Sequence, residues 1–360
     1  MFRGSPACVH AGLTGVGMKA SDHGRGEDEG VLGRARGCLL GQLAGDSLGG
    51  LVEFQKASQI RARYPKGVRE LCDGGHWDTI AGQPTDDSEL ALMLARSLVE
   101  RGAFDDDAVA RAYGRWYASG PFDCGGTIGR ALSVASRVGA NVAENARKVA
   151  SQTSQANGAM MRLSPLGVFG HAMPPAELAE LARRDARLTH PNPVCQDASA
   201  LFAVTIARAV SRGGSGQEIY EFAVAWAAES ALHADVRASL EAAATGRPAD
   251  FMTAMGWVRV ALQNAYYQLC HGESLEEGVV DSVMSGGDTD TNAAIAGALL
   301  GAVHGEGAVP RQWRAAVVGC RPEAGRRGVR RPRPREFWPV DALELADGLV
   351  QRGREHVKGA

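Results

Sequence analysis

The chain has 360 residues, of which 45% are hydrophobic and 22% are charged, and its formal net charge is −2. This composition is typical of a globular protein, and the near-neutral charge disfavours proteins that bind nucleic acid or an anionic membrane by long-range attraction. No segment reaches the ~20 apolar residues of a membrane-spanning helix, and the N-terminus lacks the apolar stretch of a secretory signal, so we expect a cytoplasmic protein. The cysteines form no CxxC pair, so we expect neither a disulfide framework nor a zinc site.

Residues 1–29 are rich in glycine and polar side chains, so a disordered N-terminal arm is expected there. From residue 30 to 360, apolar residues recur at intervals of three and four, which predicts amphipathic helices, whereas strict alternation is almost absent. The clearest predicted helices are 88–102, 105–118, 175–188, 200–213, 250–272 and 338–353. The prediction is an all-α protein with one compact domain of orthogonally packed helices.

Two long stretches, 55–87 and 318–337, carry no helical pattern and are expected to be functional or disordered loops. The second contains "RPEAGRRGVRRPRPREF", the strongest local charge bias of the chain. A basic, proline-rich stretch of this kind is usually a solvated loop, although it could contact phosphates.

Thr85, Asp86 and Asp87 stand directly before the helix predicted from residue 88. A helix N-terminus favours one hydroxyl or acidic cap, so capping explains one of these side chains but not the adjacent pair of aspartates. Capping and metal binding both remain open for this motif alone.

"SGGDTDTNAAIAGALLGA" repeats the pattern, because Asp288, Asp290 and Thr291 precede an apolar, alanine-rich run. A calcium loop of the EF-hand type would need glycine at its sixth position and glutamate at its twelfth, and Ala293 and Leu299 occupy these positions. Four carboxylates that meet across a helix-bundle cleft would repel one another and require a cation. Oxygen ligands without His or Cys favour Mg²⁺, Mn²⁺ or Ca²⁺.

Other polar positions are less specific. Asp46 and Glu53 lie in the apolar, glycine-rich segment "GCLLGQLAGDSLGGLVEF" and have no local explanation. "PFDCGGTIGRAL" (121–132) predicts a glycine-rich helix N-terminus, whose backbone N–H groups could receive a phosphate.

Taken in order, "GDSLGGLVE", "PTDDSELAL", "FDCGGTIGRAL", "NGAMMRLSPLG", "THPNP", "SGGDTDTNAAIAGALLGA" and "RPREFWPVDALELA" resemble the ADP-ribosylglycohydrolases, which include the dinitrogenase reductase-activating glycohydrolase and arginine- and serine-type protein de-ADP-ribosylases. The resemblance extends from Gly33 to Gln351. It implies a single all-α domain with a binuclear centre of two Mg²⁺ or Mn²⁺ ions.

Residue by residue, the resemblance implies three sets of site residues. The implied metal ligands are Thr85, Asp86, Asp87, Asp288, Asp290 and Thr291. The carboxylates with an implied catalytic role are Glu53, Asp87 and Asp288, and which of them is the essential acid or base stays open. The residues implied to surround the ADP-ribose are Asp123, Gly125, Asn157, Gly158, His190, Ser285, Gly286 and Gly287.

The expected activity is metal-dependent hydrolysis of the glycosidic bond between ADP-ribose and a modified protein side chain, with arginine favoured over serine. The expected partner is therefore an ADP-ribosylated protein. Two alternatives stay open. The protein could neutralise an ADP-ribosyltransferase toxin by binding it, with the N-terminal arm as the blocking segment, as well as by reversing its modification. It could also be an inactive ADP-ribose-binding relative, although all six implied metal ligands are present.

Overall fold

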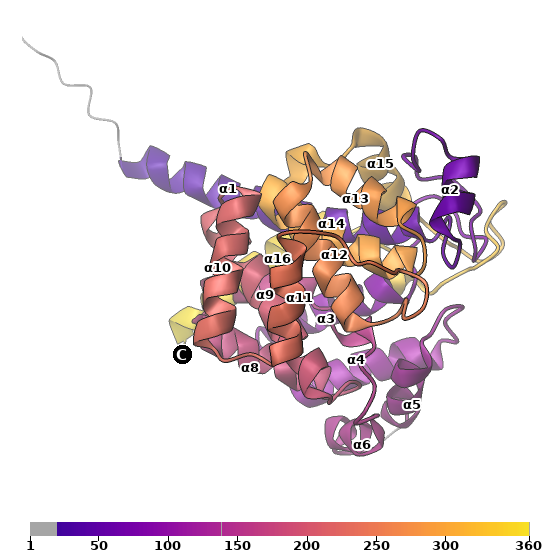
Figure 1. The fold of residues 1–360 in the computed structure, drawn as a ribbon. Coiled ribbons are helices and arrows are strands. Elements are labelled where there is room, and N and C mark those ends of the chain that lie inside the picture. Colours follow the sequence, from indigo (N-terminus) through magenta and orange to yellow (C-terminus); the bar gives the residue numbers. More distant parts are fainter. Residues whose placement is uncertain (1–19, 138, 360) are drawn as a thin grey trace, which may run out of the picture.

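The structure is a computed structural model that describes residues 20–137 and 139–359. Within these residues the chain forms sixteen α-helices and four 3₁₀-helices in one compact domain (Figure 1), and β-pairing is limited to three isolated bridges. The all-α prediction is confirmed. No helix of the described residues is long and apolar enough to span a membrane.

The helices follow one another with mostly short connections. The first eight α-helices are α1 (Ala20–Gly49), α2 (Ala57–Arg63), α3 (Asp86–Arg101), α4 (Asp106–Ala118), α5 (Gly126–Ala135), α6 (Val142–Val149), α7 (Ser164–Phe169) and α8 (Pro175–Ala186). The second eight are α9 (Pro193–Arg212), α10 (Gly216–Glu229), α11 (Ala234–Ala243), α12 (Val258–His271), α13 (Leu275–Met284), α14 (Thr289–His304), α15 (Arg311–Gly319) and α16 (Ala342–Gly359). The 3₁₀-helices are η1 (Asn157–Ala159), η2 (Gly170–Ala172), η3 (Glu306–Ala308) and η4 (Arg335–Phe337).

The structure corrects the predicted boundaries at several places. Residues 20–29, predicted as part of a disordered arm, form the first turns of α1, and Asp28 in this segment makes a 2.8 Å ion pair with Arg354 of α16. The rest of that predicted arm, residues 1–19, lies outside the described residues. The predicted helix 250–272 begins only at Val258, and the predicted loop 55–87 contains the short helix α2.

α1 and α14 pack against each other in the middle of the molecule (Figure 1), and glycines spaced four residues apart on α1 make this approach possible. A β-carbon added to Gly41 would lie 2.1 Å from the carbonyl oxygen of Gly297 on α14. Only glycine allows two helix backbones to come this close. Near the other end of the contact, a β-carbon on Gly49 would lie 2.4 Å from the Cα atom of Asp290, so the C-terminus of α1 meets the N-terminus of α14.

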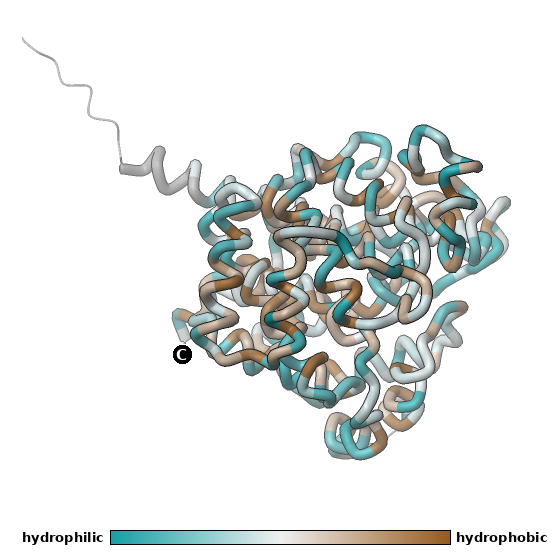
Figure 2. The backbone as a smooth tube through the Cα atoms, viewed as in Figure 1, coloured by the Kyte–Doolittle hydropathy of each residue, from teal (hydrophilic) through white to brown (hydrophobic). Residues whose placement is uncertain are grey.

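The apolar segments gather in the inner helices, and the polar segments lie on the outer turns and loops (Figure 2). α14 is buried from Thr289 to Ala302 because α1, α12 and α13 pack around it. Its first turn, which carries the second acidic motif, therefore lies in the interior of the protein.

Candidate metal centre

The two acidic motifs occupy the N-termini of α3 and α14, where they meet the turn that follows α1. The carboxylate oxygens of Glu53, Asp288 and Asp290 lie within 4.8 Å of one another. Thr85 joins α3 to this group, because its Oγ1 lies 3.5 Å from Oδ2 of Asp290. The fold thus brings together side chains that are 205 positions apart in the sequence.

Neither motif supplies the side-chain cap of its own helix. Thr85 and Asp288 stand at the N-cap positions of α3 and α14, but neither side chain accepts a hydrogen bond from the first turn of its helix. Asp46 of α1 caps α3 instead, since its carboxylate accepts hydrogen bonds from the backbone N–H groups of Thr85 and Ser88, both at 3.0 Å. Helix capping therefore does not account for the acidic motifs.

The acidic cluster differs from the other buried carboxylates in having no cationic partner. Among the described residues, no Arg, Lys or His makes an ion pair with any of its buried members, which are Asp46, Glu53, Asp86, Asp87, Asp288 and Asp290. By contrast, buried Asp185 pairs with Arg162 and buried Glu89 with Arg333, each at 2.8 Å. Burying a carboxylate without a partner is costly, so this cluster must bind protons or a cation.

Burial and mutual repulsion raise the pKa values of the clustered carboxyl groups. Burial, followed by the charges of Asp123 and Asp288, raises the pKa of Glu53 to about 8. Burial, followed by the charge of Asp46, raises the pKa of Asp86 to about 7. Burial also raises the pKa of Asp46 to about 6, although its hydrogen bonds oppose this shift. In the absence of a cation the cluster therefore retains protons near neutral pH.

Asp87 supplies an oxygen that has no protein partner. The side chain is fully buried, and its Oδ2 lies 3.0 Å from the Thr85 hydroxyl oxygen, while Oδ1 has no hydrogen-bond partner among the described residues. Because buried polar atoms are nearly always satisfied, such an oxygen fits a metal ligand. All the ligand atoms offered here are hard oxygens, so the residues fit Mg²⁺, Mn²⁺ or Ca²⁺.

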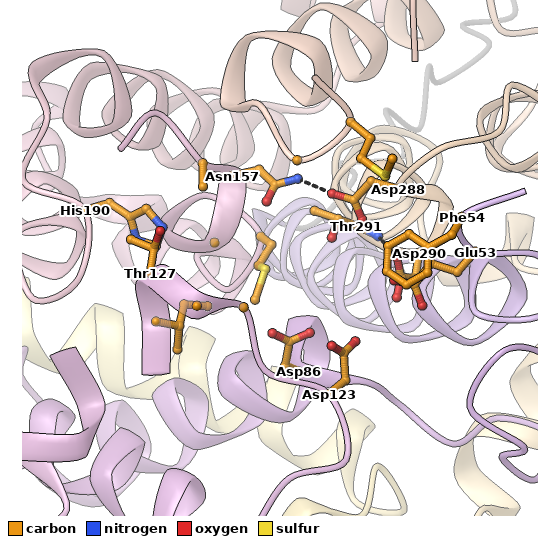
Figure 3. A pocket seen from close by; sticks show the side chains of 18 residues that line it. Glu53, Phe54, Asp86, Asp123, Thr127, Asn157, His190, Asp288, Asp290 and Thr291 are labelled. Atoms are coloured by element: carbon orange, nitrogen blue, oxygen red, sulfur yellow. Dashed lines mark hydrogen bonds between the residues drawn. The ribbon is translucent and has the colours of Figure 1, made fainter. Parts of the chain in front are cut away.

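A cavity of about 230 Å³ adjoins the acidic cluster (Figure 3). The site residues expected from the sequence that line this cavity are Glu53, Asp86, Asp123, Gly125, Asn157, Gly158, His190, Asp288, Asp290 and Thr291. Thr85 and Asp87, also expected in the site, do not line the cavity. The lining residues that sequence reasoning missed are Phe54, Gly126, Thr127, Ile128, Ala156, Met161, Met255 and Gly256. Gly126 to Ile128 belong to the recognised motif "FDCGGTIG", whereas nothing in the sequence pointed to Met255 and Gly256.

The walls of the cavity have different chemistry. Asn157 donates a 2.7 Å hydrogen bond to Oδ2 of Asp288, and Asp86 and Asp123 lie side by side on the facing wall (Figure 3). His190 forms the far end, with Nδ1 2.8 Å from the Thr189 hydroxyl and Nε2 without a partner among the described residues. Burial, followed by the charge of Arg162, lowers the pKa of His190 to about 3, so its imidazole is neutral.

Residues 285–287, expected beside the ADP-ribose, do not line the cavity. Their close approach is instead to the turn after α1: the Phe54 N–H donates to the carbonyl of Gly287 at 2.8 Å, and the Gly287 N–H donates to the carbonyl of Gln55 at 3.0 Å. Gly286 and Gly287 both have positive φ, at 79° and 78°, which glycine adopts without strain. This pairing holds Glu53 opposite Asp288.

Trp77, from the predicted loop 55–87, supports Glu53 from the other side. Its indole Nε1 donates a 2.6 Å hydrogen bond to Oε2 of Glu53. The ring also contacts His76 and Phe122, with centroid separations of 4.7 and 5.8 Å. No sequence signal identified this residue, because its partner becomes a neighbour only when the loop folds over α1.

Comparisons with known proteins agree with this geometry. Residues 27–355 match the model of the ADP-ribosylglycohydrolase family. The chain is 31% identical over 288 residues to ADP-ribosyl-(dinitrogen reductase) glycohydrolase of Rhodospirillum rubrum, covering 79% of this chain and 90% of that protein. It is 27% identical to ADP-ribosylarginine hydrolase Tri1 of Pseudomonas putida, covering 79% and 74% of the two chains.

A solved structure described as an ADP-ribosylglycohydrolase-related protein complex superposes with a TM-score of 0.72 at 28% identity, covering 90% of this chain and 99% of that chain. The family match spans nearly the whole chain, and the buried carboxylates and the cavity lie within it. The chain therefore belongs to the ADP-ribosylglycohydrolase family, whose members are hydrolases that cleave the glycosyl linkages of ADP-ribose.

Proposed function

We propose that this glycohydrolase removes single ADP-ribose groups from arginine side chains of proteins, and that it requires two Mg²⁺ or Mn²⁺ ions. The observation that carries the proposal is the buried carboxylate cluster without a cationic partner at the wall of the cavity. Arginine is favoured over serine because one relative is named for ADP-ribosylarginine. The R. rubrum relative is named for a protein substrate.

The metal ligands in this proposal are Thr85, Asp86, Asp87, Asp288, Asp290 and Thr291. The unpartnered Oδ1 of Asp87 and the close approach of Asp288 to Asp290 support this set. When bound, the cations supply positive charge that can hold the vicinal ribose hydroxyls and orient the sugar. The carboxylates themselves fix the geometry, since α1 and α14 hold them in a close-packed interior.

The remaining cavity residues bind the rest of the ADP-ribose in this proposal. Gly125 to Thr127 stand at the N-terminus of α5, where backbone N–H groups and the helix dipole favour a diphosphate. Asn157 and Gly158 form one wall, and the neutral His190 offers Nε2 at the far end. Asp123 faces the acidic cluster and is proposed to contact the ribose that carries the scissile bond.

A carboxylate is proposed to position and deprotonate the attacking water. The oxygen of this water forms a bond to the anomeric carbon, and the bond from that carbon to the arginine nitrogen breaks. The proton that the carboxylate took from the water passes to the departing guanidino group. The candidates are Glu53, Asp87 and Asp288. Glu53 lines the cavity and is held by Trp77 and by the pairing of residues 54–55 with Gly287. The carboxylates nearby stabilise the positive charge that develops on the sugar.

Release of free ADP-ribose from two purified proteins, one modified on arginine and one on serine, tests the proposal. Release from the arginine-modified protein with Mg²⁺, and none with EDTA, is expected. The Asp290→Ala variant is expected to lose both hydrolysis and Mg²⁺ binding by calorimetry while keeping its helical circular dichroism. Undiminished turnover of this variant or release in EDTA would refute the metal assignment, and release from the serine-modified protein alone would refute the linkage.

A further inference from the structure

The loop 321–337 concentrates positive charge on one surface of an otherwise acidic protein. It contains seven arginines and two glutamates, which give it a charge of +5 in a chain whose total is −2. One of these arginines, Arg333, is buried. We name the six exposed side chains the arginine ridge; they are Arg321, Arg326, Arg327, Arg330, Arg331 and Arg335.

The charge of the arginine ridge is almost unneutralised. Among the described residues, only Arg330 has a carboxylate within reach, that of Asp78 at 4.0 Å. Arg326 and Arg331 donate instead to backbone carbonyls, which leaves their charges uncompensated. An exposed cluster of like charges repels itself, so a protein gains from it mainly when an anionic partner binds there.

The loop that carries the ridge is braced from inside. The Arg333 guanidinium makes a buried ion pair with Glu89 of α3 at 2.8 Å, and its backbone N–H donates to the carbonyl of Pro322 at 2.8 Å. The Gln83 amide donates to the carbonyl of Arg331 at 2.6 Å. These bonds hold the ridge in place before a partner arrives, which lowers the entropic cost of binding.

Arg331 brings one end of the ridge next to residues that adjoin the cavity. Nε of Arg331 donates to the carbonyl of Trp77 at 2.8 Å, and Trp77 in turn bonds to the cavity residue Glu53. The Arg331 guanidinium also lies 6.0 Å from the ring centroid of Phe122, whose neighbour Asp123 lines the cavity. A protein whose side chain enters the cavity covers about 800 Å² of the surface, a disc of roughly 16 Å radius, and so reaches the ridge.

We propose that the arginine ridge binds an acidic segment of the protein substrate next to its modified arginine. This inference rests on the proposed function, because it requires a protein substrate at the cavity. It makes the ridge a determinant of which modified proteins are hydrolysed, and not of hydrolysis of free ADP-ribosylarginine, since none of the residues that line the cavity belongs to the ridge. Charge complementarity of this kind acts mainly on association and specificity.

A nucleic acid fits the ridge less well. Because the loop carries +5 and the chain −2, the remainder of the protein carries −7, which repels a long polyanion outside the ridge. The exposed part of the loop also lacks aromatic rings on which bases could stack, since Phe337 is buried. A short acidic peptide segment avoids both problems.

The test uses peptides with one arginine flanked by four glutamates, four lysines or four serines. The unmodified, fluorescein-labelled peptides report binding to the ridge without hydrolysis, and the expected order of affinity is glutamate over serine over lysine, by about threefold to tenfold per step at low salt. The same peptides carrying ADP-ribosylarginine are expected to follow this order in kcat/KM. High salt should reduce the preference.

The charge-reversal variant Arg326→Glu/Arg327→Glu is expected to invert the preference while leaving hydrolysis of free ADP-ribosylarginine unchanged. Arg212→Glu/Arg237→Glu, on α9 and α11, has the same net charge change and should retain the preference of the original protein. Equal affinity for the three unmodified peptides would overturn the ridge proposal. If the original protein prefers the glutamate-flanked peptide but does not hydrolyse free ADP-ribosylarginine, the proposed function would be overturned instead.

Discussion

The carboxylate of Asp46 on α1 accepts hydrogen bonds from both the backbone N–H and the hydroxyl of Thr85, at 3.0 and 2.9 Å. The Thr85 hydroxyl has one proton, and two carboxylates compete for it, those of Asp46 and of Asp87 at 3.0 Å. When the proton points to Asp46, the lone pairs of Thr85 Oγ1 face Asp87 and Asp290. Asp46 can therefore orient Thr85, a proposed metal ligand, without binding the metal itself.

Asp46→Asn is expected to weaken Mg²⁺ binding about tenfold or more, because a hydrogen bond to a charged group contributes about 1.5–3 kcal/mol. Isothermal calorimetry measures the dissociation constant, and circular dichroism checks the fold. Asp105→Asn is the matched control, since Asp105 caps α4 away from the site and should leave Mg²⁺ binding unchanged.

The combination of Asp46→Asn with Thr85→Val separates this role from a general loss of charge. If Asp46 acts through the Thr85 hydroxyl, the double variant loses little more Mg²⁺ affinity than the weaker-binding single variant. Fully additive losses would show that Asp46 contributes only its negative charge.

Unfolding of the metal-free protein is expected to become easier as the pH rises. The pKa values of Glu53 and Asp123 are raised to about 8 and about 9, in both cases first by burial. Such groups bind protons more tightly in the folded than in the unfolded state, so their contribution to stability is present below their ordinary pKa values, near 4, and is lost as the pH rises through the folded values.

Calorimetric melting in EDTA at about pH 5, 7 and 9 measures how the stability of the metal-free protein changes with pH. The melting temperature should fall by several degrees from pH 5 to pH 9. Saturating Mg²⁺ should reduce this dependence on pH, because the cation replaces the protons. A melting temperature in EDTA that rises toward pH 9 would contradict the raised pKa values.

Gly41→Ala is expected to destabilise the protein by about 1–3 kcal/mol or more, because the added β-carbon would lie 2.1 Å from the carbonyl oxygen of Gly297. Urea denaturation measures the loss. Gly33→Ala on the same helix is the control: a β-carbon there has no neighbour within 4 Å, so alanine should stabilise by up to about 1 kcal/mol. Equal effects of the two substitutions would show that the helix contact is looser than described.

Trp77→Phe is expected to lower kcat about tenfold with little change in KM for free ADP-ribosylarginine, because it keeps the ring but removes the N–H group that holds Glu53. Steady-state kinetics measures kcat and KM, and Mg²⁺ calorimetry checks that the loss of kcat does not come from weaker Mg²⁺ binding. Trp226→Phe on α10 also replaces an indole by a phenyl ring and is the control, which should leave kcat unchanged. An unchanged kcat would show either that Glu53 is held without Trp77 or that Glu53 is not the catalytic carboxylate.

Local sequence patterns predicted the elements that carry the acidic motifs. Apolar spacing identified α3, and the paired acidic residues at the starts of α3 and α14 indicated more than capping, which the absence of side-chain caps at Thr85 and Asp288 supports. These features depend on neighbouring residues along one helix, so the sequence displays them directly.

The supports of the site depend on packing between distant segments, which local patterns do not encode. Asp46 had no explanation until α1 was placed against the start of α3, and Trp77 lay in a loop without a pattern. The turn 285–287 was expected to approach a ligand, but its glycines approach the backbone after α1. Glycine indicates close approach in the sequence without identifying what approaches.

The contact between α1 and α14 also determines when during synthesis the protein can become active. Four of the six buried carboxylates, from Asp46 to Asp87, leave the ribosome within the first quarter of the chain, whereas Asp288 and Asp290 follow about two hundred residues later. Until α14 emerges, the glycine-lined face of α1 has no partner, and closing so long a loop is slow. A nascent or truncated chain that lacks α14 therefore cannot assemble the acidic cluster, so the proposed metal site can form only in a chain that has been translated past α14.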